Sequence, residues 1–246
     1  MKSLLFTVLF TIFSFAGSIK VAAAANVTYA MQDLIKSFNK KYPNIKVETN
    51  IGSSGKLAAL ILNKAPFDIF MSANMNYPNA IYKKDLAKLE PKVYALGELA
   101  ILSVKDINLS KGLNILLDKK IKKIAIANPK TAPYGVAAKE ALKNLKLFNR
   151  LKSKFIYGQS VGQTLIYTLR AADIGFVAKS ALFSKELSYL KRGKIWTDVN
   201  SSLYHPIKQG IVLLKRANSE AKKFYEFILS KEAKEIFKKY GYKVNE

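Results

Sequence analysis

Cysteine is absent from the 246 residues, and histidine occurs once, as His205. The chain therefore has no disulfide and no thiolate ligand, and it lacks the imidazole cluster that a zinc site needs. A Ser–His–acid triad would have to use His205, which stands beside Pro206 in a segment that we expect to connect two domains. These absences predict a protein that is not an enzyme, holds no metal cation and needs no cofactor.

Acidic residues are scarce, since 17 Asp and Glu stand against 41 Lys and Arg and give a formal net charge of +24. A nucleic-acid or other polyanion binder is one interpretation of such a charge. However, lysine far outnumbers arginine, the lysines are spread over every predicted helix, and aromatic residues are not interleaved with them as a stacking surface requires. We therefore expect a solvated basic surface and no nucleic-acid partner. Such a surface also raises the local concentration of anions.

The one long apolar run stands at the N-terminus, and none follows it later in the chain. At the N-terminus, Lys2 precedes the run LLFTVLFTIFSF, which is followed by the small residues AGS at 16–18. This is the three-part layout of a secretory signal; the alternative is a retained anchor, but the run is short for a bilayer span. We predict a signal peptide at 1–18 and a periplasmic mature protein. The Ala run at 22–25 then belongs to the first buried strand.

Short apolar runs alternate with stretches of helical periodicity through the rest of the chain. Continuous runs at 19–24, 122–127 and 174–178 fit strands that are buried on both faces. This rhythm predicts an α/β architecture with mostly parallel sheets flanked by helices.

Two long strand-like segments, 92–104 and 204–214, divide this rhythm into two units. We expect the chain to leave a first domain along one of them and to return along the other. Domain I then comprises residues 19–95 plus 208–246, and domain II comprises residues 96–207.

Four strand-to-helix junctions share one pattern, in which a few small or polar residues separate a buried strand from a helix. They lie around Asn26, Ser54, Tyr134 and Val161. The first N–H groups of a helix have no intrahelical acceptor, and the helix dipole adds positive charge, so these ends accept anions. Ligands of open α/β sheets sit beyond the carboxyl ends of the strands. The four junctions therefore predict an anion site in one cleft.

The glycines of GSSGKL, around Ser54, do not form a P-loop. A Walker pattern that ends at Gly55-Lys56 needs glycine where Asn50 stands and Ser or Thr where Leu57 stands. Nucleotide binding at this junction is not expected.

The sequence resembles the periplasmic substrate-binding proteins of ABC transporters, specifically their molybdate- and tungstate-binding group. The motifs that carry the resemblance span nearly all of 19–246; they are AAAANVTYAMQDL, GSSGKLAALI with APFDIFMSAN, IAIANPKTAPYGVAAKEAL and FYEFILSKEAKEIFKKYGY. The resemblance implies a two-domain periplasmic-binding-protein fold with two hinge strands. It also implies a monomer that binds a tetrahedral oxyanion between its domains and delivers it to a membrane permease.

Carried over by position, the resemblance implies that Asn26 donates to the anion through its amide and Ser54 through its hydroxyl and backbone N–H. Tyr134 and Val161 would each donate a backbone N–H. Ser53 is a further candidate hydroxyl, with plain helix capping as the alternative.

One position departs from the family pattern. Many relatives have a Tyr hydroxyl where this chain has Ala178, so that contact must come from another group or be missing. The donor set still suits molybdate, a dianion at neutral pH whose oxygens only accept hydrogen bonds. Molybdenum would be held as the oxyanion, with no side chain ligating a metal cation.

Other ligands stay open. Sulfate or another anion is an alternative, because sulfate differs from molybdate mainly in size. Iron receptors of related fold use adjacent tyrosines, and no Tyr-Tyr pair occurs in this chain. A basic polyanion-binding or nucleic-acid-binding protein is the alternative from another class.

Overall fold

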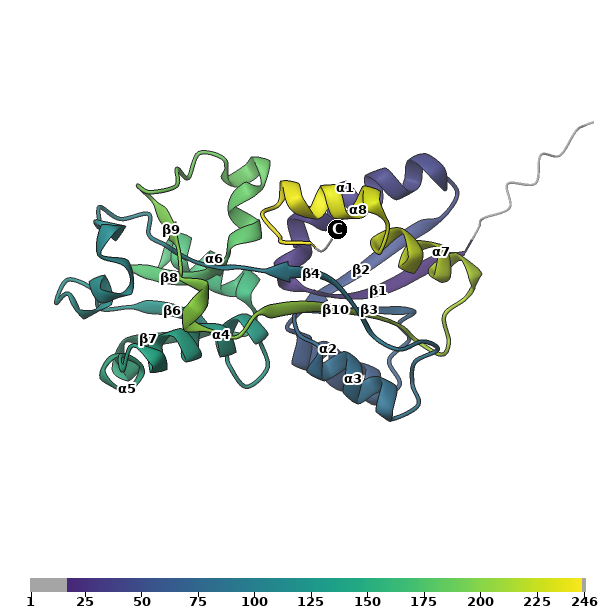
Figure 1. The fold of residues 1–246 in the computed structure, drawn as a ribbon, viewed down its shortest axis with the longest axis horizontal. Helices are drawn as coiled ribbons and strands as arrows, with labels where there is room; N and C mark the ends of the chain where they lie inside the picture. Colours follow the sequence, from purple (N-terminus) through teal and green to yellow (C-terminus); the bar gives the residue numbers. More distant parts are fainter. Residues whose placement is uncertain (1–16, 245–246) are drawn as a thin grey trace, which may run out of the picture.

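The computed structural model describes residues 17–244, which form two lobes joined by two extended segments (Figure 1). The predicted signal segment 1–18 thus lies outside the described residues except for its last two positions. Within 17–244, no helix is long and apolar enough to cross a membrane.

Each lobe is built on one five-stranded sheet. The first sheet has the order β2 (Lys46–Gly52), β1 (Ser18–Ala24), β3 (Ile69–Ser72), β10 (Ile207–Leu213) and β4 (Lys92–Gly97). The second has the order β7 (Phe155–Gly158), β6 (Ile124–Ala127), β8 (Ile174–Ala178), β5 (Leu99–Leu102) and β9 (Trp196–Asp198).

The sheets are mixed rather than mostly parallel. β1 runs parallel to β2 and β3, and β6 runs parallel to β7 and β8. The strands next to the lobe crossing, β10 and β5, run antiparallel to their neighbours. The α/β prediction is confirmed, and the antiparallel pairs arise because β4 and β10 carry the chain out of the first lobe and back into it.

Helices cover both faces of each sheet (Figure 1). The first lobe has α1 (Thr28–Lys41), α2 (Ser54–Leu62), α3 (Asn76–Lys83), α7 (Ser219–Ile228) and α8 (Lys231–Lys239). The second has α4 (Pro133–Asn144), α5 (Phe148–Leu151) and α6 (Val161–Arg170), with short 3₁₀ turns that include η2 (Leu109–Leu117) and η4 (Lys179–Phe183). The first 3₁₀ turn, η1 (Ala25–Val27), links β1 to α1.

Ala22, Ala23 and Ala24 of the Ala run lie in β1, an interior strand of the first sheet, and their small side chains let helices approach from both sides. Val21 and Ala23 pack into the core beneath α1, α7 and α8, whereas Ala22 packs into the core beneath α2 and α3. Phe38 of α1 contacts Phe224 of α7 edge to face, with ring centroids 5.0 Å apart. This packing fixes where β1 ends and therefore where the first predicted site loop lies.

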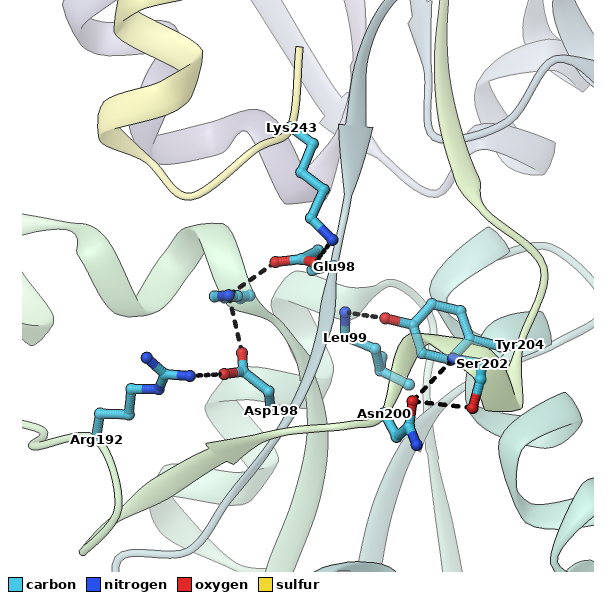
Figure 2. Close-up of polar contacts among 9 residues, drawn as sticks. Glu98, Leu99, Arg192, Asp198, Asn200, Ser202, Tyr204 and Lys243 are labelled. Atoms are coloured by element: carbon cyan, nitrogen blue, oxygen red, sulfur yellow. Dashed lines mark hydrogen bonds and ion pairs between the residues drawn. The ribbon is translucent and has the colours of Figure 1, made fainter. Parts of the chain in front are cut away.

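Charged side chains link the lobes at the first crossing (Figure 2). Glu98 lies between β4 and β5, and its carboxylate pairs with Lys179 at 2.7 Å and with Lys243 at 2.6 Å. Lys179 also pairs with Asp198 at 2.9 Å, and Asp198 contacts Arg192. The network thus ties the C-terminal tail of the first lobe to η4 and β9 of the second.

The pKa values in this network reflect a balance between burial and ion pairing. Burial alone would raise the pKa of Glu98, but hydrogen bonds from Lys179 and Lys243 outweigh it and lower the pKa below its ordinary 4.5. Burial alone would lower the pKa of Lys179, and its bonds to Glu98 and Asp198 raise it instead. Both partners are therefore charged at neutral pH.

Glu98→Gln is expected to destabilise the protein at neutral pH by about 1–2 kcal/mol, since it removes charge-assisted bonds that are partly screened by solvent. A carboxyl whose pKa is lower in the folded state stabilises the fold above its unfolded pKa and loses that effect as the pH falls through the folded value. The difference between wild type and variant should therefore shrink below about pH 4. Urea unfolding at pH 7 and pH 3.5 measures this difference in the free energy of unfolding, and Glu90→Gln, at an exposed residue, is the control. An equal difference between wild type and Glu98→Gln at both pH values would contradict the role of the network.

Candidate functional site

The site residues predicted from the sequence all line one small cavity between the lobes. It is bounded by the ends of β1, β2 and β3 in the first lobe and by the starts of α4 and α6 in the second. Its lining residues are Ala24, Ala25, Asn26, Gly52, Ser53, Ser54, Ala73, Ala132, Pro133, Tyr134 and Val161. The volume is about 10 Å³, the room of about one water molecule.

Three helices begin at this cavity. Ser54 is the first residue of α2, Tyr134 the second residue of α4, and Val161 the first residue of α6. Their backbone N–H groups have no intrahelical acceptor, and the three helix dipoles direct partial positive charge at the same small volume. Backbone alone therefore makes the cavity a place where negative charge is stabilised.

Two serine hydroxyls add side-chain donors. Ser53 is buried at the N-cap of α2, yet its hydroxyl makes no capping bond and has no hydrogen-bond partner. The Ser54 hydroxyl accepts a bond from the Ala73 N–H at 2.9 Å, which leaves its own hydrogen to donate. The capping alternative for Ser53 is thus not what the structure shows.

Asn26 is held by other protein groups. Its Nδ2 donates to Gln209 Oε1 and to Tyr242 Oη, each at 2.8 Å, and its Oδ1 is buried without a partner. Its backbone carbonyl accepts from Ser180 Oγ at 2.8 Å and from Tyr242 Oη at 2.9 Å. The amide hydrogens that the sequence assigned to an anion are therefore used within the protein in this conformation.

The Tyr134 side chain extends toward Gly97 at the end of β4. Its hydroxyl is buried without a partner near the hinge, where a Cβ on Gly97 would lie only 2.2 Å from the Oη atom. Burial raises the pKa of Tyr134 well above its ordinary value, and the neighbouring Tyr242 raises it further. The phenol therefore stays protonated and carries no negative charge. Tyr134 offers its backbone N–H to the cavity as the second residue of α4.

Ala178 is the last residue of β8 and is buried beside Leu99 of β5. It lines a neighbouring groove of about 200 Å³ between α1 and α6, rather than the small cavity. The hydroxyls on this side, those of Ser180 and Tyr242, both bind the Asn26 carbonyl. They position the Asn26 loop and do not lie among the cavity-lining groups.

Sequence reasoning missed these positioning residues. Gln209 gave a weak signal, since it is a polar residue that follows Lys208 in a mainly apolar strand; unlike Lys208, it is fully buried. Ser180 and Tyr242 gave none, because their contacts with Asn26 span 154 and 216 residues of chain.

Among the residues that the structure describes, no charged side chain lines the cavity. Throughout residues 17–244, no three His, Cys, Asp or Glu side chains are grouped as a metal ion would require. His205 is exposed and pairs with Glu140 at 3.2 Å in a separate groove. The arrangement therefore supplies neutral donors and neither a nucleophile with its base nor a cation site.

The lobes are closed on one another around the cavity. The Gly55 N–H of the first lobe donates to the Thr131 carbonyl of the second at 2.9 Å. Lys56 Nζ donates to Gln159 Oε1 at 2.5 Å across the same boundary. On the opposite side of the cavity, a Cβ at Gly162 would lie 3.3 Å from the Ala25 Cβ.

Two α/β lobes, joined by two crossing segments and closed around a donor-lined cavity, define a two-domain binding protein. The family model for bacterial extracellular solute-binding proteins matches residues 19–243. The molybdate-binding protein ModA of Azotobacter vinelandii is 34% identical over 231 residues, which cover 92% of this chain and 90% of that protein. The chain belongs to the bacterial extracellular solute-binding proteins, and its location is extracytoplasmic.

Two further relatives agree. A protein of Bacillus subtilis (strain 168), named as the substrate-binding lipoprotein of an ABC transporter, is 32% identical over 230 residues, covering 92% of this chain and 86% of that protein. The solved structure of the Azotobacter vinelandii periplasmic molybdate-binding protein superposes with a TM-score of 0.85 at 30% identity, covering 93% and 100% of the two chains. These relatives are solute-binding proteins, and the predicted two-domain fold is confirmed.

Gly55→Ala is expected to hinder closure of the lobes. The new Cβ would lie 2.9 Å from the Thr131 carbonyl oxygen and 2.7 Å from Tyr77 Oη, and the Thr131 backbone cannot turn aside as a side chain could. Spin labels at Lys83→Cys and Lys143→Cys, one on each lobe, report the separation, and the absence of native cysteine makes the labelling specific. The variant should shift the distance distribution to longer values.

Gly52→Ala is the matched control, since its Cβ would meet only the Leu57 side chain of its own lobe, at 3.4 Å. Identical distance distributions for wild type and Gly55→Ala would show that this contact does not limit closure.

Proposed function

We propose that this protein is a periplasmic receptor that binds molybdate, and also tungstate, between its lobes and delivers it to the permease of an ABC transporter. Residues 1–18 are its export signal. The protein acts as a monomer, without a cofactor and without a nucleic-acid partner. The names of its relatives support the ligand, and the resemblance of the motifs to the molybdate group supports the permease.

The observation that carries the proposal is a cavity lined by neutral donors at the start of three helices. Molybdate at neutral pH carries two negative charges, and every oxygen is an acceptor, so a site made of donors satisfies it. A carboxylate acceptor, which would suit a protonated phosphate, is missing from the lining residues. Each charge-assisted bond contributes about 1.5–3 kcal/mol net.

In this assignment, Ser54 binds the oxyanion through its hydroxyl and N–H, and Tyr134 and Val161 bind it through their N–H groups. Ser53 adds a second hydroxyl, since its Oγ has no other partner. Asn26 contributes through its loop at the end of β1; its amide must exchange a protein partner if it is to reach the anion directly.

Binding requires the lobes to open and close. The lobes touch beside the cavity through the Gly55–Thr131 bond, so an oxyanion can reach it only when they separate, and the lining groups must make room for the anion when the lobes close again. We propose that residues 19–95 with 208–246 move as one body and residues 96–207 as the other. The hinge then lies at the crossings beside Glu98 and Ile207, and the Gly55–Thr131 bond forms on closure.

Calorimetric titration of the protein without residues 1–18 tests the ligand. Molybdate and tungstate should bind with large heats at micromolar protein, and sulfate and phosphate should bind far more weakly or not at all. Absence of heat with both molybdate and tungstate would refute the proposal. Stronger binding of sulfate than of molybdate would mean that the protein is an anion receptor whose ligand is sulfate.

Ser53→Ala and Ser54→Ala should each weaken molybdate binding by roughly 1–3 kcal/mol, because each removes a donor to a charged ligand. Their effects on the ligand-free protein should differ. Ser54→Ala also removes the acceptor of the Ala73 N–H and should lower the unfolding temperature, whereas Ser53→Ala removes no protein bond. Calorimetry and thermal unfolding separate the two effects, with exposed Ser110→Ala as control. Unchanged affinity in either serine variant would remove that residue from the site.

A further inference from the structure

The residues that give the chain its net charge of +24 lie outside the cavity, since none of the described lining residues is charged. The second lobe shows where part of that charge is gathered. β6 and β7 are parallel, and α4 and α6 begin at the cavity after them. The segments that precede these strands, and the ends of the two helices, therefore lie at the opposite end of the lobe (Figure 1).

This end of the second lobe, here called the basic pole, carries a set of exposed cations. They are Lys119, Lys120, Lys122, Lys123, Lys143, Lys146, Arg150, Lys152 and Arg170. Their sequence positions are scattered, but the fold collects them.

Two contacts hold the segments of the basic pole together. The Lys154 ammonium donates to the carbonyls of Leu116 and Asp118, at 3.1 and 3.2 Å, which fixes the segment before β7 against the segment before β6. The register pairs Ile124 with Phe155, which sets Lys123 beside Lys154. These contacts place the cations before β6 beside the segment that precedes β7.

Carboxylates do not balance this charge. Asp173 is buried beneath the basic pole, where it accepts the backbone N–H groups of Lys122 and Lys123 at 2.7 and 2.8 Å and pairs with Lys105. Three other acids of the lobe, Glu98, Asp198 and Glu140, are paired near the hinge with Lys179 and His205. In the described chain, Asp106 and Asp118 are the exposed carboxylates at this end.

An aromatic groove borders the basic pole along the edge strand β7. It has a volume of about 520 Å³ and is lined by Lys123, Phe155, Ile156, Tyr157, Tyr167 and Ala171. Tyr157 is 44% exposed. Lysines with long apolar stems beside amphipathic tyrosines are typical of surfaces that meet the headgroup region of a bilayer.

We propose that the basic pole and the β7 groove bind the anionic headgroups of membrane phospholipids. Seven of the nine cations are exposed lysines. Lysine ammonium groups act as hydrated point charges and suit a diffuse array of phosphates rather than one bidentate site. The extracytoplasmic location places a membrane within reach of the protein. The basic pole lies away from the cavity, so a membrane-bound protein keeps its ligand cleft free.

Co-sedimentation with lipid vesicles tests this surface. Vesicles of 30% phosphatidylglycerol in phosphatidylcholine should bind the protein at low salt, vesicles of pure phosphatidylcholine should not, and 0.5 M NaCl should release it. The variant Lys119→Gln/Lys120→Gln/Lys122→Gln/Lys123→Gln should bind about 600-fold more weakly, since each of its four cations near an anionic surface contributes about fivefold. Its affinity for molybdate should equal that of the wild type, which separates this surface from the ligand site.

The matched control is Lys36→Gln/Lys40→Gln/Lys231→Gln/Lys239→Gln, which changes the net charge equally but on α1 and α8 of the first lobe. It should change vesicle binding less than threefold. Equal losses in the two variants would overturn the proposal, because net charge alone would then explain binding. No binding of the wild type to the anionic vesicles would overturn it too, as would a stronger affinity for single-stranded RNA than for the vesicles at the same salt.

Discussion

Backbone N–H groups at the start of a helix lack an acceptor within that helix, and in this protein three helices from two lobes place such groups around one cavity. Parallel strands make this arrangement possible, since β2, β6 and β7 each end on the cavity side and each is followed there by a helix. Small residues, among them Ala24, Gly52 and Ala132, keep the strand ends and helix starts close. The polarity of the site is thus a property of the fold, and the side chains add hydroxyls to it.

A site of this kind depends on the relative position of the lobes more than on any one side chain. Asn26 makes hydrogen bonds to residues of both lobes. Its amide is bound by Gln209 and Tyr242 of the first lobe, whereas its carbonyl also accepts from Ser180 of the second. The Asn26 loop is thus held within the first lobe by Gln209 and Tyr242 and is linked to the second lobe by Ser180.

The sequence was sufficient for most strands, for the two-lobe organisation and for part of the cavity lining, because apolar runs and strand-to-helix junctions are local signals. It did not predict the short strand β9, and the one segment expected at 92–104 forms two strands, β4 and β5. Ala22, Ala23 and Ala24 are buried as the composition predicts. The junctions around Tyr134 and Val161 lie together because they follow parallel strands of one sheet, and the junction around Ser54 meets them across the two lobes. The antiparallel direction of β5 and β10 was not predictable from apolar periodicity, which is the same in either direction. Nor were the partners of Asn26, which come from segments distant along the chain.

The position of the exposed lysines on the folded protein was likewise not predictable from the sequence. Lysines that are scattered in the sequence are collected by topology at the end of the second lobe, because every segment before a parallel strand lies there. Exposed charges are screened within about 8 Å in physiological salt, so cations at that end act on what lies beside them and contribute little inside a closed cavity. Neutral donors in the cavity can therefore select an anion by its hydrogen-bonding pattern, while the exterior charge governs where the protein resides. Because the two functions use different groups, the exterior charge can vary without changing the donors that contact the ligand.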